Sequence, residues 1–170
     1  MTKRSRKSQP ILSIPRSPVE LALEVVAAVG ILWGCWIIFQ SWDALPQRIP
    51  IHFGFSGRPD AWGDKVAIWI LPAVAAFFEV MWAVLGNYPH TFNYPVAITE
   101  ENARVQYQLA RSLLAWLKVE MIWLFVWILW QQIQVSLGKE EMVSVGFVLS
   151  IIMVFLGTFG VYFKRAFLAR

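Results

Sequence analysis

The sequence predicts an all-α integral membrane protein. Its expected architecture is a four-helix bundle with both termini cytoplasmic and an ordered extracytoplasmic hairpin between helices 1 and 2. Apolar residues make up 58% of the 170-residue chain, whereas soluble domains contain about 45–50%. Four apolar runs have the roughly 17–25 residues that a helix needs to cross a bilayer. Lysine and arginine gather on one side of these runs, which sets the orientation.

The four predicted spans are residues 19–39, 66–85, 113–130 and 143–163, within one membrane domain of residues 19–170. Residues 1–18 are predicted to form a basic, flexible N-terminal tail. The first run exceeds the roughly 7–15 apolar residues of a signal peptide. The "SWDALPQ" that follows it lacks an A-x-A cleavage pattern. We therefore expect an uncleaved first span.

Ten lysines and arginines lie in the N-terminal tail, the middle connection and the C-terminal tail. Four others lie in the remaining two connections. Because these residues accumulate on the cytoplasmic side, both termini are expected in the cytoplasm and residues 40–65 outside. The net charge of +4 does not indicate a nucleic-acid partner, since the basic residues stand at the ends of apolar runs. The expected partner is the lipid bilayer.

Four ionisable residues lie inside the apolar runs, where a charge is costly and usually faces the protein interior. They are Glu24, Glu79, Lys118 and Glu120. Their positions place them in one layer near the cytoplasmic side. This intramembrane polar cluster predicts either a structural pair of Lys118 with Glu24 or Glu79, or a protonatable site. Lys118 and Glu120 point about 200° apart on one helix and should face different neighbours.

Two other features bear on the helices. Gly30 and Gly34 form a G-x-x-x-G pattern, which allows close helix contact. It predicts either packing within the chain or a homo-oligomer. The third helix is expected to begin at Glu100, with Thr99 as its N-cap.

The polar stretch "IPIHFGFSGRPDAWGDK", residues 49–65, is the candidate ligand-binding site. Residues 49–53 predict a short extended segment and residues 58–60 a turn. The proposed ligand-binding residues are His52, Arg58, Asp60, Asp64 and Lys65. Asp64 is also placed to cap the second helix.

Nothing in this stretch predicts catalysis, a metal site or a cofactor. The other histidine, His90, falls on the opposite side of the membrane. No Ser-His-Asp set, phosphate loop or CxxC is present, and the single cysteine, Cys35, excludes an intramolecular disulfide. We therefore predict that the protein is not an enzyme.

Two stretches resemble a known family. "LPQRIPIHFGFSGRPDAWGDK", residues 45–65, resembles the signature of the bacterial membrane family called domain of unknown function 1648. "NYPVAITEENARVQYQLARSLLAWLK", residues 93–118, is similar to the segment that follows it there. The positions that match the signature are Pro46, Pro50, His52, Phe53, Gly57, Pro59, Asp60 and Lys65.

This family includes the membrane part of immunity proteins against the Sdp toxin. That part senses the toxin and tethers a repressor. Those proteins have a further C-terminal membrane domain, for which the sequence predicts no counterpart. The resemblance implies an integral membrane protein of bacterial type.

Three hypotheses follow for the function. The first is a non-enzymatic sensor or immunity-like protein that binds an extracellular peptide, a lipid headgroup or another membrane protein through residues 42–65. The second is a small proton-coupled transporter, or transporter subunit, that uses Glu24, Glu79 and Glu120. The third is a structural assembly partner of a membrane complex.

Overall fold

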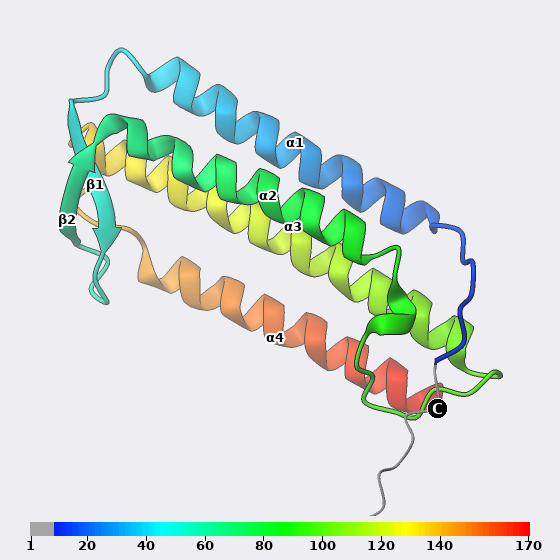
Figure 1. Cartoon of the computed structure of the whole chain (residues 1–170). Helices are drawn as coiled ribbons and strands as arrows, with labels where there is room; N and C mark the ends of the chain where they lie inside the picture. The colour runs from blue at the N-terminus through cyan, green and yellow to red at the C-terminus, as the bar shows by residue number, and fades with distance from the viewer. Residues whose placement is uncertain (1–8) are drawn as a thin grey trace, which may run out of the picture.

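The computed structural model describes residues 9–170. Four long helices lie side by side, and a two-stranded hairpin closes one end of the bundle (Figure 1). The elements are α1 (Pro18–Ser41), β1 (Arg48–Phe53), β2 (Pro59–Asp64), η1 (Lys65–Trp69), α2 (Ile70–Leu85), η2 (Pro89–Thr91), α3 (Ala103–Ser136) and α4 (Val145–Leu168). The chain is mostly helical rather than all-α, and the predicted bundle and hairpin are confirmed.

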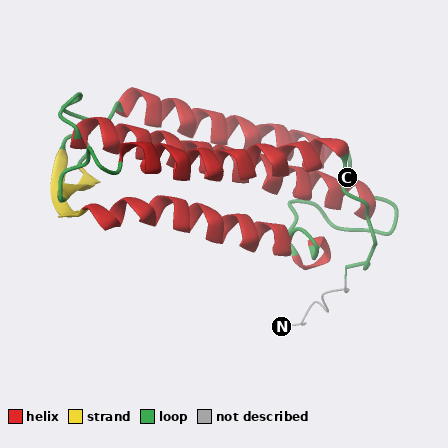
Figure 2. Cartoon of the chain, turned by 90° about the horizontal axis from the view of Figure 1, so that it is seen from above, coloured by secondary structure: helices red, strands yellow, loops and turns green. Residues whose placement is uncertain are grey.

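The bundle has two distinct ends, which Figures 1 and 2 show from two directions. The hairpin and the α3–α4 connection lie at one end, called here the hairpin end. The first described residues, the C-terminus and the α2–α3 connection lie at the other, called the tail end. An even number of helices that each cross the bundle once brings the two ends of the described chain to the same end of the bundle.

The outer faces of the helices are apolar and uncovered. Four helical segments of the described chain, including η1 with α2, are long and apolar enough to cross a membrane. Large side chains such as Leu32, Phe77 and Met153 are exposed on them. Contiguous apolar surface of this extent is unfavourable in water and suits a lipid solvent. The protein is therefore a multi-pass membrane protein, as predicted.

Helix α3 is the centre of the bundle, because it packs against α1, α2, α4 and β1. Gly30 and Gly34 of α1 are buried against it. A Cβ atom on Gly30 would lie 2.9 Å from Ile122 Cγ2 of α3. The G-x-x-x-G pattern thus serves packing within the chain, one of the two roles predicted for it.

The start of α3 differs from the prediction. The regular helix begins at Ala103, so the expected start at Glu100 is wrong, whereas Thr99 makes the expected capping contact. The Asn102 Oδ1 accepts a bond from the Thr99 N–H at 2.9 Å, and Thr99 Oγ1 accepts one from the Asn102 N–H at 3.3 Å. This reciprocal pair has the pattern of a capping box and orders the turn before the helix. The Thr99 hydroxyl also lowers the pKa of the exposed Glu101 carboxyl.

Residues 9–17 have no regular secondary structure, but they are held against α3. The Tyr107 hydroxyl donates to the Pro10 carbonyl at 2.9 Å, and Arg111 Nη1 donates to the Ile14 carbonyl at 2.7 Å. The sequence predicts a flexible tail over residues 1–18, whereas this part of it is fastened. Burial of polar side chains on α3 explains the difference, since each finds a tail carbonyl as its partner. The basic residues 3–7 lie outside the described residues.

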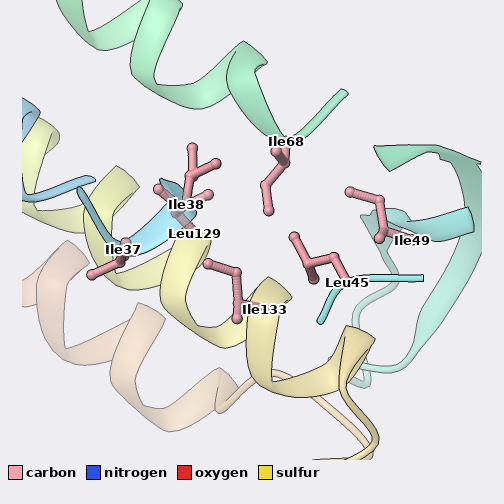
Figure 3. Packing of buried hydrophobic residues seen from close by; sticks show 7 residues of the cluster. All are labelled: Ile37, Ile38, Leu45, Ile49, Ile68, Leu129 and Ile133. Carbon is pink, nitrogen blue, oxygen red and sulfur yellow. The ribbon is translucent and has the colours of Figure 1, made fainter. Parts of the chain in front are cut away.

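An apolar cluster fastens the hairpin to the bundle (Figure 3). It joins α1, the α1–β1 connection, β1, η1 and α3. Its buried members are Ile37, Ile38, Leu45, Ile49, Ile68, Leu129 and Ile133. Full burial of one such side chain contributes about 1.5–3 kcal/mol. The hairpin is therefore part of the folded core and not a loose connector.

Candidate binding surface and buried charge cluster

The hairpin pairs β1 and β2 in antiparallel register, with two irregularities around His52. Residues 49–53 are extended, as predicted. Ile49 and Pro50 are both buried, and Ile51 and His52 are both exposed, so a simple alternation of faces is not followed. A bulge produces this pattern, because one extra residue on a strand shifts the side chains after it. Its effect here is to turn His52 outward.

The turn of the hairpin lies earlier than the sequence indicates. The Gly57 N–H donates to the Gly54 carbonyl at 2.8 Å, and the Gly54 N–H donates to the Arg58 carbonyl at 2.9 Å. Gly57 has φ +77°, a conformation that glycine adopts without steric cost. Pro59 and Asp60 belong to β2. The predicted turn at residues 58–60 is therefore wrong, because the glycines and not the proline reverse the chain.

His52 and Asp60 form an exposed pair across the two strands. His52 Nδ1 lies 2.5 Å from Asp60 Oδ1, and the side chains are 68% and 51% exposed. Exposed ion pairs contribute little to stability, typically about 0–1 kcal/mol. Folding alone gives little reason for this pair, which makes it the strongest polar candidate for ligand binding.

The other three predicted ligand-binding residues make structural contacts. Asp64 Oδ1 accepts from the Val66 N–H at 2.8 Å and caps η1, as predicted. Lys65 Nζ lies 4.5 Å from the centroid of the Trp42 ring. Arg58 lies 3.7 Å from Glu141 of the α3–α4 connection and remains largely exposed. Of these three residues, only Arg58 has a largely exposed side chain and lies close in sequence to the His52–Asp60 pair.

Three apolar side chains of the hairpin are uncovered, and the sequence reasoning missed them. Phe55 at the turn is fully exposed, and Ile51 and Trp62 are about half exposed (48% and 49%). Phe55 stands between Gly54 and Gly57 in the sequence. A side chain at the tip of a glycine-rich turn cannot reach the core, so an aromatic residue there is expected to be exposed. The glycines around Phe55 could therefore have identified it from the sequence. These three residues with His52, Arg58 and Asp60 are called here the hairpin surface.

A second polar site lies inside the bundle. Lys118 of α3 has a side chain only 2% exposed, and its Nζ donates to Glu24 Oε2 of α1 at 2.5 Å and to Glu79 Oε1 of α2 at 3.1 Å. The predicted pair is thus a group of three. Lys118, Glu24 and Glu79 are called here the charge triad.

Glu120, the fourth predicted member, is not part of the triad. Its Oε1 accepts from the Thr158 hydroxyl of α4 at 2.5 Å. It lines a cleft of about 900 Å³ between α3, α4 and the chain before α1. The separation follows from the expected rotation of about 200° between Lys118 and Glu120 along a helix.

An ion pair near the tail end also escaped the sequence analysis. Arg111 Nε lies 3.0 Å from Glu20 Oε1, and Arg111 Nη2 donates to Glu20 Oε2 at 3.1 Å. Both side chains are 10% exposed. The sequence spacing could have indicated this pair. Glu20 and Glu24 are one helical turn apart and share a face of their helix, and Arg111 and Lys118 are two turns apart and share a face of theirs. The two acid–base pairs therefore follow one another along the same helix interface.

Among residues 9–170, no group of three His, Cys, Asp or Glu side chains is placed to hold a metal ion. The described features are therefore a displayed surface at the hairpin end and a buried charge triad toward the tail end. Together with four spanning helices, they define the protein as a multi-pass membrane protein with a structured hairpin cap.

Comparison with known proteins identifies one segment. Residues 29–76 match the family model described as "Domain of unknown function (DUF1648)". The match runs from within α1 through the hairpin into α2, so it contains the predicted signature of residues 45–65. The second resembling stretch, residues 93–118, lies beyond the matched residues.

An archaeal protein is similar over part of the chain. It is named "Uncharacterized protein" from Archaeoglobus fulgidus and is 29% identical over 76 residues. The match covers 40% of this chain and 40% of that relative's length. No solved structure matches.

Proposed function

We propose that the protein is a non-enzymatic membrane sensor, of the immunity-like kind, that binds its ligand through the hairpin surface. One observation carries the proposal. A hairpin fixed in the core displays a hydrogen-bonded His52–Asp60 pair and three large apolar side chains that the chain itself leaves uncovered. The matched family segment contains this hairpin.

The hairpin is held in place from three sides. Ile49 is 0% exposed in the apolar cluster. The buried Gln132 of α3 donates through Nε2 to the Pro50 carbonyl at 2.6 Å. The Val143 N–H of the α3–α4 connection donates to the Gly57 carbonyl at 2.8 Å. A surface ordered before binding loses less conformational entropy on binding, which favours recognition.

The chemistry of the surface indicates the ligand class. Phe55, Ile51 and Trp62 offer apolar contact, and His52 with Asp60 offers a hydrogen-bond donor and acceptors beside it. A peptide, or an exposed segment of another membrane protein, supplies both apolar side chains and backbone polar groups. We propose this class of ligand over a lipid headgroup, because Arg58 is the only basic side chain of the hairpin surface and is already directed at Glu141.

The proposal places the hairpin end outside the cell, following the charge distribution. Ser56→Cys in a Cys35→Ser background tests it, since Ser56 is exposed at the turn. A membrane-impermeant maleimide should label this variant in intact cells. A cysteine at exposed Asn93, near the tail end, should be labelled only after permeabilisation. The reverse pattern would refute an extracellular ligand.

The role of the surface is tested by rescue of a gene-deletion phenotype in the host. The triple variant His52→Ala, Arg58→Ala and Asp60→Ala should lose rescue at unchanged membrane abundance. The matched control is Glu140→Ala, an exposed carboxylate of the α3–α4 connection at the same end of the bundle, which should rescue fully.

Full rescue by the triple variant at equal abundance would overturn the proposal. If, in addition, carboxyl-to-amide changes at Glu24, Glu79 and Glu120 each abolished rescue, the result would favour the carrier hypothesis.

A further inference from the structure

The charge triad has one negative charge more than it has cations. Glu24 and Glu79 each accept from the same Lys118 ammonium. If all three groups are ionised, the net charge is −1 between membrane-spanning helices. A net charge at that place is costly unless a further positive charge compensates it.

One carboxylate oxygen of the triad lacks a hydrogen-bond partner among the described residues. Glu79 Oε1 accepts from Lys118, but Glu79 Oε2 is buried and has no hydrogen-bond partner among the described residues. A buried polar atom without a partner is costly, and far more so when it carries charge. A proton on this oxygen removes the charge and leaves a neutral acid.

A small cavity reaches from two members of the triad toward the tail end. It has a volume of about 30 Å³ and is lined by Glu24 and Lys118 of the triad and by Arg16, Glu20 and Arg111, but not by Glu79. One water needs roughly 10–15 Å³ of such space, so the cavity holds about two. Arg16 is exposed at the start of α1, which brings the cavity to the surface.

We propose that Glu24, Glu79 and Lys118 form a proton-binding site that exchanges with the solution at the tail end. A hydronium ion in the cavity gives up one proton by breaking its O–H bond and remains as water. Glu24, the carboxylate that lines the cavity, receives the proton on an oxygen lone pair and forms the new O–H bond. Transfer to Glu79 Oε2 breaks that bond and forms another, so the carboxyl pair holds one proton. No electrons are transferred, and the charge of the site changes from −1 to zero.

The charged groups around the site are accounted for by helix. α1 and the residue preceding its cap supply Glu24, Glu20 and Arg16, α2 supplies Glu79, and α3 supplies Lys118 and Arg111. The Glu20 and Arg111 charges compensate each other. Arg16 is exposed to solution, where water and salt screen its charge. The proton therefore compensates the excess charge of the triad itself.

Infrared titration of the purified full chain in detergent tests the site. The absorption of protonated carboxyl groups is followed against pH in a Glu120→Gln background, which removes the carboxyl that is bonded to Thr158 of α4. This background should show one buried protonated carboxyl that titrates. Glu79→Gln and Glu24→Gln should each lose it, because either change leaves one carboxylate for one ammonium. Lys118→Met should instead show two.

The Glu→Gln variants should lose the protonated carboxyl, whereas Lys118→Met should gain a second one. Because the expected changes are opposite, the test still decides if one variant fails to fold. Absence of a titrating buried carboxyl in the background protein would overturn the proposal. Its persistence in both Glu24→Gln and Glu79→Gln would also overturn it. Ala115→Val, which narrows the cavity without removing a charge, should slow proton exchange after a pH jump. An unchanged rate would refute entry through this cavity.

Discussion

Replacing Lys118 with methionine should destabilise the protein far more than replacing either of its acidic partners. Methionine keeps an unbranched apolar chain but removes the only cation between Glu24 and Glu79. The Lys118 side chain is 2% exposed, so water cannot substitute for it. Removing one partner of a buried ion pair costs about 3–5 kcal/mol, because the remaining carboxylates must either stay charged without a cation or take up protons to become neutral.

Glu79→Gln is the contrasting change. It leaves Lys118 bonded to Glu24 as a neutral pair, and its amide oxygen replaces the acceptor. The expected cost is about 1 kcal/mol, the net value of one hydrogen bond. The double variant Lys118→Met/Glu79→Gln has a single carboxyl, which protonation makes neutral. It should therefore be more stable than Lys118→Met alone, with a coupling energy of about 0.5–3 kcal/mol.

The assay is reversible unfolding in mixed micelles as the fraction of sodium dodecyl sulfate rises. The ten tryptophans supply a fluorescence signal, and circular dichroism follows the helices. Two results would refute direct pairing within the triad. One is a cost below about 1 kcal/mol for Lys118→Met, under the range for a broken buried pair. The other is a double variant no more stable than the worse single variant.

Three further predictions concern packing and use the same unfolding assay. Ile49→Ala should cost about 2–5 kcal/mol because it opens a cavity in the core, whereas Ile51→Ala on the exposed face should change stability by about 0.5 kcal/mol or less. Gly57→Ala should destabilise more than Gly138→Ala; both positions have positive φ, but only at Gly57 would the added methyl meet neighbouring backbone. Gly30→Val should cost about 1–3 kcal/mol by overpacking against α3 and leave the elution volume in size-exclusion chromatography unchanged; a shift to a smaller species would revive the dimer interpretation.

The sequence predicted the helices well because length and apolar composition are local properties. A run of about 20 apolar residues has few alternatives to a spanning helix, since every backbone polar group must bond within it. The first and second spans accordingly end within two residues of the predicted helical limits. Helix α3 runs from Ala103 to Ser136 and so extends beyond the predicted span of 113–130 at both ends; only the start before the span, at Glu100, was expected from a capping pattern. Its flanking turns are polar, and hydropathy does not register them.

The hairpin was predicted less completely. The extended conformation of residues 49–53 and the capping role of Asp64 were predicted correctly. The turn was misplaced because proline and glycine both indicate turns, and only the backbone of Gly57 decides which one reverses the chain. The exposure of Phe55 depends on what the rest of the chain covers, which no local pattern contains.

By itself the sequence determined that the protein spans a membrane four times, that its termini share a side, and that its intramembrane charges need partners. Only the tertiary structure decided who those partners are. Lys118 meets Glu24 and Glu79 across sequence separations of 94 and 39 residues, and Arg111 meets Glu20 across 91. Helical periodicity fixes which residues share a face of one helix. The rotation and offset between helices come from packing, such as the close approach of α1 to α3 at Gly30.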